Sequence, residues 1–580
     1  MTGQLLECTV DETSNVSRLL AFLVTLQAAA LDSFGQNDTS FDPKTYVDII
    51  LREPLNATEN AFLALQRTNG LLSNATVTKF VAEYFDPAGS EVVFHRSADY
   101  TPQPSGFLSN VHNEVALKWA HEVHEIWPTL SRKEKSEVAT RSEMYTMVSL
   151  KNPFVIPGSR FREVYYWDSY WVIRGLVVSK MLATARGMVD NLLSMVETYG
   201  FVPNGARKYY LNRSQPPFLS EMVKTLVEAA GDLTLVEKAL PILIREHTFW
   251  TTAPHVVHIQ DSTGVVHSLS RYFAKWNTPR PESATIDIEV AEQVEESKRP
   301  QLYNDIASTA ETGWDFSSRW MEDRFNLSTL RTSKVVPADL NAYLFQMEKN
   351  IATFAKLVGD AKTRRAFAKK AEARRAAIEA VLWNEEMKQW NDYWLPDHFC
   401  ESSMEAVKFD RKARNKLVYA SNFVPIWCGL PLSNDRVESI VGALKSSGLI
   451  HPAGIATSLI QTGQQWDYPN GWAPLQHMII EGLHSTRSKA AKTLAEDIAV
   501  RWLRTNYATF VATGAMQEKF DVRVCGASGG GGEYTDQTGF GWTNGVVLAL
   551  FDHFGWPEHR DITSCPSYRS SSLVGSKNLN

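Results

Sequence analysis

Apolar residues recur every three or four positions over several long segments, and this spacing restricts what the chain can fold into. It places apolar side chains on one face of an α-helix, which must then be buried against a neighbour. The clearest stripe follows Pro337, which suits a first helical turn, and stops before Gly359, which suits a helix end. Strand-like alternation is scarce, with one hairpin expected within residues 255–269. The sequence predicts an all-α fold, with further stripes at residues 188–199, 367–382 and 491–502.

The chain is long and nearly balanced in charge. It has 580 residues, with 59 Lys and Arg against 65 Asp and Glu, so its formal net charge is −6. Nucleic-acid binding needs a dense basic face, so no nucleic-acid partner is expected. No apolar run approaches the ~20 residues that cross a bilayer, so no transmembrane span is expected. Length alone suggests about four domains, but the succession of helices favours one large helical domain.

The longest apolar stretch, Leu19–Ala30, lies near the start of the chain and ends in three alanines. A short apolar core followed by small residues is typical of a secretory signal peptide. Residues 1–30 are therefore interpreted as a possible signal peptide, which predicts a secreted or extracellular glycoprotein. Glycosylation sequons at Asn37, Asn56 and Asn74 agree with export. The alternative is a first helix packed on the domain of a cytoplasmic protein.

The cysteines and histidines form no metal-binding pattern. Beyond the possible signal peptide the cysteines are scattered, and they allow two disulfides, one or none. The 14 histidines include no HExxH motif. We therefore expect no metal and no cofactor. The cysteines in question are Cys400, Cys428, Cys525 and Cys565.

Loops rich in Trp, Gly, Pro and Arg separate the helical stripes, and such loops on a helical scaffold are where sites are built. Arg160, Trp167 and Asp168 occur together in one of them. Aromatic rings offer flat apolar faces to the C–H groups of sugars, and Asp and Arg can bond hydroxyls. A buried Arg–Asp pair that caps a helix is the alternative. A second loop, at residues 202–217, adds Asn204, Arg213 and Gln215.

Other loops place carboxylates among aromatic residues. Asp315 lies between a tryptophan and a phenylalanine, and apolar surroundings raise a carboxyl pKa as a general acid requires, whereas nearby Arg319 opposes this. An N-cap role is the alternative for Asp315. Asp467 lies between Trp466 and Trp472, in a loop suited either to a sugar or to packing at a helix start.

Four glycines at residues 529–532 follow another carboxylate, Glu518. They lack the Gly-Lys-Ser/Thr of a nucleotide loop, and close approach of backbone to a ligand explains them better. Taken together, the chain offers carboxylates, arginines, tryptophans and amides, with no serine elbow and no Cys–His pair. Carboxylate pairs beside aromatic platforms point to glycoside hydrolysis. The residue types alone leave open which two carboxylates act.

With these loops the sequence resembles the trehalase family, glycoside hydrolase family thirty-seven, and most of all its animal members. Two long signatures carry the resemblance, PGSRFREVYYWDSY at 157–170, with Ser159 in place of a usual glycine, and QWDYPNGWAP at 465–474. Shorter matches follow in the family's order between residues 150 and 550. They are VPNGARKYYLNRSQPP, RPES, TGWDFSSRW, EKFDV and GGGGEYTDQTGFGWTNGV.

The resemblance implies an (α/α)6 toroid, a double ring of helices with a loop-built active site at one end. It also implies hydrolysis of α,α-trehalose to two glucose molecules, with inversion and without metal. Asp315 would be the general acid and Glu518 the general base. The positions that match sugar contacts are Arg160, Trp167, Asp168, Asn204, Arg213, Ser214, Gln215, Arg280, Pro281, Glu282, Gly313, Trp466 and Glu533.

The same interpretation divides the chain into parts. Residues 31–109 are expected to form a helical extension packed on the catalytic domain, residues 110–556 the catalytic domain, and residues 557–580 a polar tail. One alternative is another (α/α)6 exo-glycosidase acting on maltose or starch ends. The other is a non-catalytic sugar-binding protein, which would keep Trp and Arg but lose one of the two carboxylates.

Overall fold

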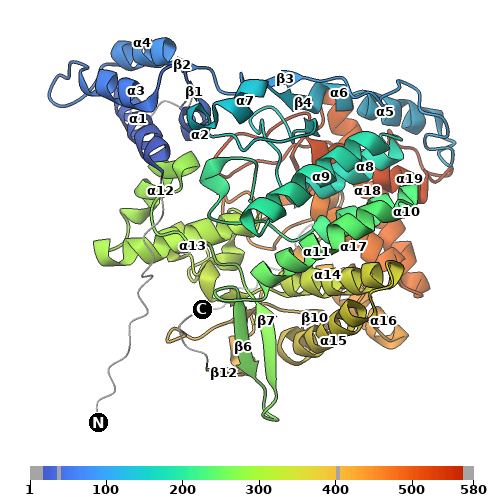
Figure 1. Cartoon of the computed structure of the whole chain (residues 1–580). Helices are drawn as coiled ribbons and strands as arrows, with labels where there is room; N and C mark the ends of the chain where they lie inside the picture. Colours follow the sequence, from blue (N-terminus) through green and yellow to red (C-terminus); the bar gives the residue numbers. More distant parts are fainter. Residues whose placement is uncertain (1–16, 35–40, 400–404, 566–580) are drawn as a thin grey trace, which may run out of the picture.

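The computed structural model describes residues 17–34, 41–399 and 405–565 of the chain. Within these ranges α-helices dominate, and the strands are short and gathered in sheets of two or three. Successive helices from α8 to α11 pack side by side and continue through α14 to α15 (Figure 1). The predicted helix-rich fold is confirmed, although it also contains small sheets that the term all-α leaves out.

Each predicted helical stripe corresponds to a helix or a helix pair. The stripe at 188–199 lies in α9, which ends at Gly200 with a left-handed φ of 89°. The stripe at 367–382 runs through α15 and into a π-helical turn, Ile378–Leu382. The main helices are α5 (Glu114–His124), α8 (Asp168–Val178), α9 (Leu182–Tyr199), α10 (Leu219–Ala230), α11 (Leu233–Trp250), α12 (Ala284–Ala291), α13 (Arg299–Glu311), α14 (Ala338–Leu357), α15 (Ala361–Ala377), α16 (Asn434–Ser446), α17 (Ala473–His484), α18 (Lys489–Thr513) and α19 (Gly541–Phe554).

The strands join loops that are far apart in the sequence. The expected hairpin is confirmed as β6 (Val256–Gln260) and β7 (Val266–Ser270), which pair antiparallel. Of most consequence is the pairing of β15 (Asn470–Trp472) with β16 (Lys519–Asp521), in which Trp472 lies opposite Lys519. This pairing brings the tryptophan loop before α17 next to the segment that carries Glu518.

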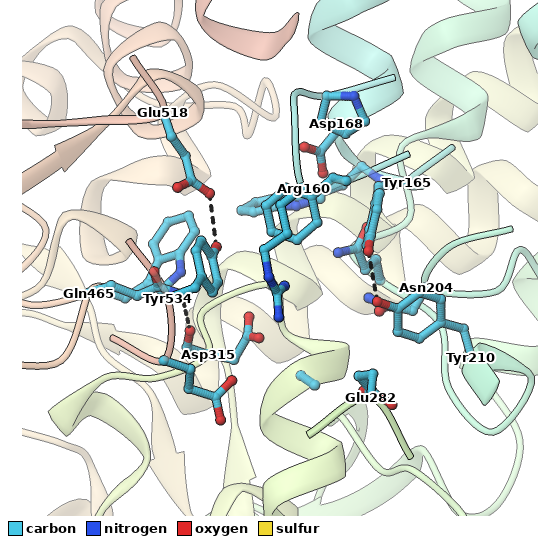
Figure 2. Close-up of a pocket in the computed structure, with 18 of the residues that line it drawn as sticks. Arg160, Tyr165, Asp168, Asn204, Tyr210, Glu282, Asp315, Gln465, Glu518 and Tyr534 are labelled. Atoms are coloured by element: carbon cyan, nitrogen blue, oxygen red, sulfur yellow. Dashed lines mark hydrogen bonds between the residues drawn. The ribbon is translucent and has the colours of Figure 1, made fainter. Parts of the chain in front are cut away.

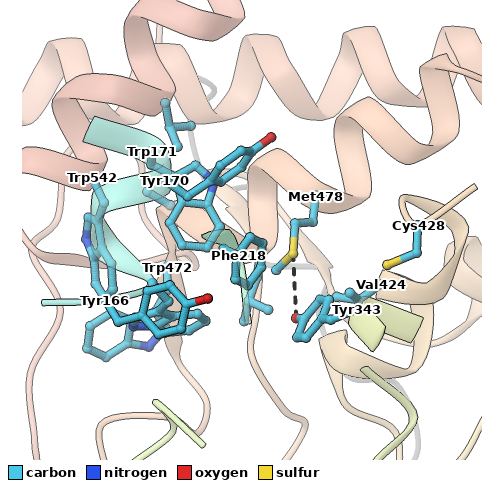
Figure 3. Packing of buried hydrophobic residues seen from close by; sticks show 14 of the residues in the cluster. Tyr166, Tyr170, Trp171, Phe218, Tyr343, Val424, Cys428, Trp472, Met478 and Trp542 are labelled. Carbon is cyan, nitrogen blue, oxygen red and sulfur yellow. Dashed lines mark hydrogen bonds between the residues drawn. The ribbon is translucent and has the colours of Figure 1, made fainter. Parts of the chain in front are cut away.

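The core is rich in aromatic side chains, and two glycines let helices cross within it. A Cβ built on Gly175 of α8 would lie 2.6 Å from Cα of Gly545 in α19, so these helices meet backbone to backbone. Around this crossing buried rings pack together, with Trp171 edge to face against Trp542 and tilted against Phe218 (Figure 3). The close crossing fixes the start of α8, where Asp168 lies.

The N-terminal helices form a smaller apolar cluster against the main body. Leu19–Ala30, the expected signal-peptide core, lies in α1 (Arg18–Phe34), where Leu23 and Leu26 are buried. Residue 31, the expected start of the extension, therefore falls inside a helix. The cluster also includes residues of α2 (Pro43–Asp48), α3 (Leu55–Leu63) and α4 (Asn74–Tyr84). No helix in the described ranges is long and apolar enough to span a bilayer.

Among the cysteines that the structure describes, two are paired and one is free. Cys525 forms a disulfide with Cys565, which attaches the beginning of the expected polar tail to the loop after β16. Cys428 is a buried free thiol, and Cys400 lies outside the described residues.

Candidate active site

Loops at the ends of several helices converge on one pocket (Figure 2). They precede α10, α12 and α17, follow α13, and connect α18 to α19, while the start of α8 completes the wall. The predicted site residues in the lining are Arg160, Trp167, Asp168, Asn204, Arg213, Gln215, Arg280, Glu282, Gly313, Asp315, Trp466, Glu518 and Glu533.

Two predicted contact residues lie behind this lining. The Ser214 hydroxyl donates to the backbone oxygen of Val202 at 2.6 Å, and its side chain is fully buried. The carbonyl of Pro281 accepts a hydrogen bond from the Gln27 side chain at 3.0 Å. Both residues therefore support neighbours in the pocket wall, and their contact with the sugar stays a prediction.

Tryptophans form one wall of the pocket. The ring of Trp466 stacks on Trp472 with centroids 4.0 Å apart and on Trp314 at 5.3 Å. Gly313 has a φ of 74°, and a Cβ there would lie 2.8 Å from the indole of Trp167. Any side chain at this position would push the ring away, so glycine is needed for close packing. The wall offers apolar faces of the kind that sugar C–H groups contact.

Asp315 has the surroundings of a group that is protonated near neutral pH. Burial, reinforced by the nearby Glu533 carboxylate, raises the pKa of Asp315 to about 7, while Arg280 and Arg213 act in the opposite direction. The backbone oxygen of Asp315 accepts a 2.6 Å hydrogen bond from Gln465, which fixes the loop that carries it. A carboxyl group with this pKa can donate a proton at neutral pH.

Glu518 is only 2% exposed, and basic and hydroxyl groups surround its carboxylate. The Tyr534 hydroxyl donates to Oε1 at 2.9 Å, and Lys519 Nζ lies 3.6 Å from Oε2. Burial raises the pKa of Glu518, and Lys519, Tyr534 and Arg160 oppose that rise. The ionised form of Glu518 is thus supported by an ion pair and a hydroxyl hydrogen bond, and the Asp315 side chain has neither among the described residues.

A chain of polar contacts connects the loops of these two carboxylates. Lys519 Nζ donates to Oε1 of Gln465 at 2.9 Å, and Gln465 Nε2 donates to the backbone oxygen of Asp315. Lys519 is completely buried, and its ammonium group lies 5.3 Å from the centroid of the Trp472 ring. One lysine therefore faces Glu518 and also fixes the position of the Asp315 loop.

Arg319, expected to oppose the raised pKa of Asp315, faces elsewhere. Its guanidinium makes paired hydrogen bonds to Asp339, at 2.8 Å each, and to Asp392, at 2.8 and 3.0 Å. Asp467 is similarly occupied, because it accepts hydrogen bonds from hydroxyl and backbone donors of Ser317 and Ser318. For Asp467, packing at the loop is therefore the correct alternative.

The pocket arginines are held by carboxylates. Arg213 pairs with Glu282 at 2.5 Å, and Arg280 pairs with Glu533 at 2.9 Å and with the buried Asp287. Arg160 makes two 2.8 Å hydrogen bonds to Asp42, just before α2. These pairs fix the guanidinium planes before any ligand binds.

Comparison with known proteins shows the family of the chain. Residues 38–555 match the family model described as Trehalase. The chain belongs to the trehalase family. A probable trehalase from Oryza sativa subsp. japonica is 50% identical over 94% of this chain and 97% of the relative. Human trehalase is 38% identical over 89% of this chain and 86% of the relative.

A solved structure agrees with this membership. The neutral trehalase of Saccharomyces cerevisiae shares 27% identity with a TM-score of 0.55, covering 69% of this chain and 73% of that one. The family resemblance read from the motifs is confirmed. The expected preference for animal members is not seen among these relatives, since the rice protein is more similar than the human one.

Several residues of this trehalase-family pocket were not predicted from the sequence. Tyr534 and Lys519 each follow a predicted site residue directly, and Gln465 precedes Trp466, so neighbouring positions in the motifs were the available signal. Asp42 and Gln27 lie far away in the chain, and no motif indicated them. Among the described residues no group of three His, Cys, Asp or Glu side chains could hold a metal ion.

Proposed function

We propose that this protein hydrolyses α,α-trehalose to two glucose molecules, with Asp315 as general acid and Glu518 as general base. The proposal rests on the different surroundings of two carboxyl groups in one pocket. Asp315, with a pKa of about 7, can hold a proton, and Glu518 has Tyr534 and Lys519 beside it. Family membership and the names of the relatives supply the substrate.

The two groups would act in a single displacement. Glu518 removes a proton from a water molecule, and the oxygen of that water attacks the anomeric carbon. Asp315 gives its proton to the departing glycosidic oxygen as the bond breaks. The attacked sugar leaves as β-glucose and the other as α-glucose, since only one centre inverts. A water must fit on the Glu518 side, so a separation of roughly 6.5–9.5 Å between the carboxyl groups is expected.

The pocket suits a neutral, hydroxyl-rich disaccharide. Arginine–carboxylate pairs offer fixed donors and acceptors around the cavity, and the tryptophan wall offers apolar faces. We also infer that the helices form the (α/α)6 double ring of the family. The succession of paired helices and the placement of the pocket at loop ends support this.

We further propose that the enzyme works in an oxidising compartment, secreted or extracellular. The Cys525–Cys565 disulfide supports this, because such bonds persist outside the reducing cytosol. The sequon asparagines Asn56 and Asn74 are exposed on α3 and α4, whereas Asn37 lies outside the described residues. Glycan release from natively expressed protein tests the idea, and unmodified asparagines with free thiols would favour a cytoplasmic enzyme.

Glucose release from trehalose, maltose and starch, measured side by side, tests the substrate. Hydrolysis of maltose or starch but not trehalose would favour another exo-glycosidase, and binding without turnover would favour a sugar-binding protein. Proton NMR at early times tests the mechanism, with one α-glucose and one β-glucose expected. Two α-glucoses at first appearance would mean retention and would refute the roles given to Asp315 and Glu518.

A further inference from the structure

Helix α1 carries a polar residue that is fully buried in an otherwise apolar face. Gln27 has no exposed surface, and it lies among Leu23, Leu26 and Ala30, which are also buried. Burying a polar side chain is unfavourable unless its donors and acceptors find partners. The partners of Gln27 therefore indicate what this side chain does.

Among the described residues, the side-chain hydrogen bonds of Gln27 all go to backbone groups of other segments. Its Nε2 donates to the oxygen of Pro43 at 2.9 Å and to the oxygen of Pro281 at 3.0 Å. Its Oε1 accepts from the backbone N–H of Thr285 at 3.1 Å, in the first turn of α12. One amide group thus joins α1, the start of α2 and the turn that leads into α12, which lie together in Figure 1.

The turn that Gln27 holds is part of the pocket wall. Pro281 lies between Arg280 and Glu282, and both of these neighbours line the pocket. Asp287 binds the guanidinium and backbone N–H of Arg280 from within the same segment. Gln27 supplies the side-chain hydrogen bonds from α1 to this turn, which also packs against α2.

The start of α2, which Gln27 also contacts, is connected to a third pocket arginine, Arg160. Pro43 is the first residue of α2, and Asp42 directly before it caps the helix through the backbone N–H of Lys44. The Asp42 carboxylate also accepts two hydrogen bonds from the guanidinium of Arg160. The position of α2 against α1 therefore affects where the Arg160 guanidinium is held.

We infer that Gln27 is a positioning residue for the sugar-contacting turn Arg280–Glu282, and that α1 is retained in the working enzyme. Cleavage after Ala30 would remove this amide and leave the Pro281 oxygen and the Thr285 N–H without their partner. The inference rests on the proposed function for its effect on the substrate. It does not depend on that function for its effect on the segment itself.

The test compares three full-length variants with the wild type. Gln27→Leu removes all three hydrogen bonds and keeps roughly the same volume. Gln27→Glu restores part of them, because a neutral carboxyl has one donor and one acceptor, and burial favours the neutral form. Leu23→Ala is the matched control, since it removes a buried apolar side chain from α1 and leaves all three hydrogen bonds of Gln27 in place.

We expect Gln27→Leu to raise KM for trehalose by about ten- to a hundredfold with less change in kcat, because the turn binds the sugar equally in the ground state and the transition state. Gln27→Glu should lie between this variant and the wild type. Leu23→Ala should lower the melting temperature and leave KM near the wild-type value. Hydrogen exchange should become faster in residues 281–287 of Gln27→Leu and stay unchanged there in Leu23→Ala.

A wild-type KM and wild-type exchange in Gln27→Leu would overturn the inference. So would an equal rise in KM in Leu23→Ala, because the effect would then be general loosening of α1. If Gln27→Leu does not fold, Gln27→Glu decides, and a wild-type KM with unchanged exchange overturns the inference. If the wild type releases no glucose from trehalose, the proposed function fails, and the exchange comparison still decides whether Gln27 holds the turn.

Discussion

Replacing Tyr534 with phenylalanine removes one hydroxyl beside Glu518 and leaves the ring in place. The hydroxyl donates to Glu518 Oε1 at 2.9 Å, and the carboxyl is buried. A hydrogen bond to a charged group contributes about 1.5–3 kcal/mol, and about 1.4 kcal/mol corresponds to one pKa unit. Since the bond favours the ionised carboxylate, its loss should raise the pKa of Glu518 by about one to two pH units.

The pH dependence of kcat/KM measures this change. A general base acts only when ionised, so the acidic limb of the Tyr534→Phe profile should move to higher pH by about one to two units. The alkaline limb should move less, because the hydroxyl donates its hydrogen bond to Glu518 and not to Asp315. The assay is the initial rate of glucose release from trehalose at low substrate across the pH range.

Tyr210→Phe provides the matched control. Tyr210 lines the same pocket on the side away from Glu518, and its hydroxyl lies 2.7 Å from that of Tyr165 (Figure 2). Its acidic limb should coincide with that of the wild type. An unmoved acidic limb in Tyr534→Phe, in a protein with the wild-type melting temperature, would refute the assignment of Glu518 as the base or of Tyr534 as its partner.

Three further predictions follow from the same geometry. Asp315→Asn and Glu518→Gln should each lower kcat by about 10²–10⁴-fold at an unchanged melting temperature; a loss of less than tenfold in glucose release would contradict the assigned roles. Because the protonated form of Asp315 is the active one and its pKa is about 7, kcat/KM of the wild type should fall as pH rises through about 7; a rate–pH profile that stays flat far into the alkaline range would count against it. Arg280→Ala should lower the free energy of unfolding in urea by about 3–5 kcal/mol, because it leaves Asp287 buried without its cation. Arg160→Ala should lower it less, since the partner carboxylate of Arg160 is one-third exposed. Equal losses of stability in the two variants would contradict this reasoning.

The sequence predicted the helices well, because a single helix face is a local property. The stripes at 188–199 and 340–358 need only neighbours three and four positions apart, and both are helical in the structure. The N-terminal apolar stretch shows the limit of prediction from local spacing. A short apolar run ending in alanines is typical both of a signal peptide and of a packed helix. The hydrogen bonds of Gln27 to Pro43, Pro281 and Thr285 favour the packed helix, and they are visible only in the folded chain.

The sequence predicted which residues line the site, but not which of them contact one another. Motif positions named most of the pocket lining, because a family's contacts remain at matching positions. Arg319 was assigned an effect on Asp315 from its closeness in sequence, whereas its partners lie 20 and 73 residues further along the chain. Pairing between loops, such as β15 with β16, depends on the folded chain and cannot be read from local spacing.

The distribution of cations accounts for the different roles of the pocket carboxyls. Glu282 and Glu533 pair with arginines, and Glu518 has Lys519 nearby. Asp168 and Asp315 have no ion-pair partner in the part of the chain that the structure describes. Burial, together with the carboxylates nearby, raises the pKa of both well above the usual range for aspartate.

The protein's own charges can therefore keep an acid and a base together in one small pocket. Two carboxylates close together cannot both ionise freely, so the one nearer to a cation loses its proton first. Lys519 provides that cation for Glu518, and its hydrogen bond to Gln465 keeps the ammonium group directed between the two loops. Replacing Lys519 with methionine should then bring the two pKa values together and narrow the pH range of activity from the acidic side. A profile as wide as that of the wild type would show that Tyr534 and Arg160 are sufficient to keep Glu518 ionised.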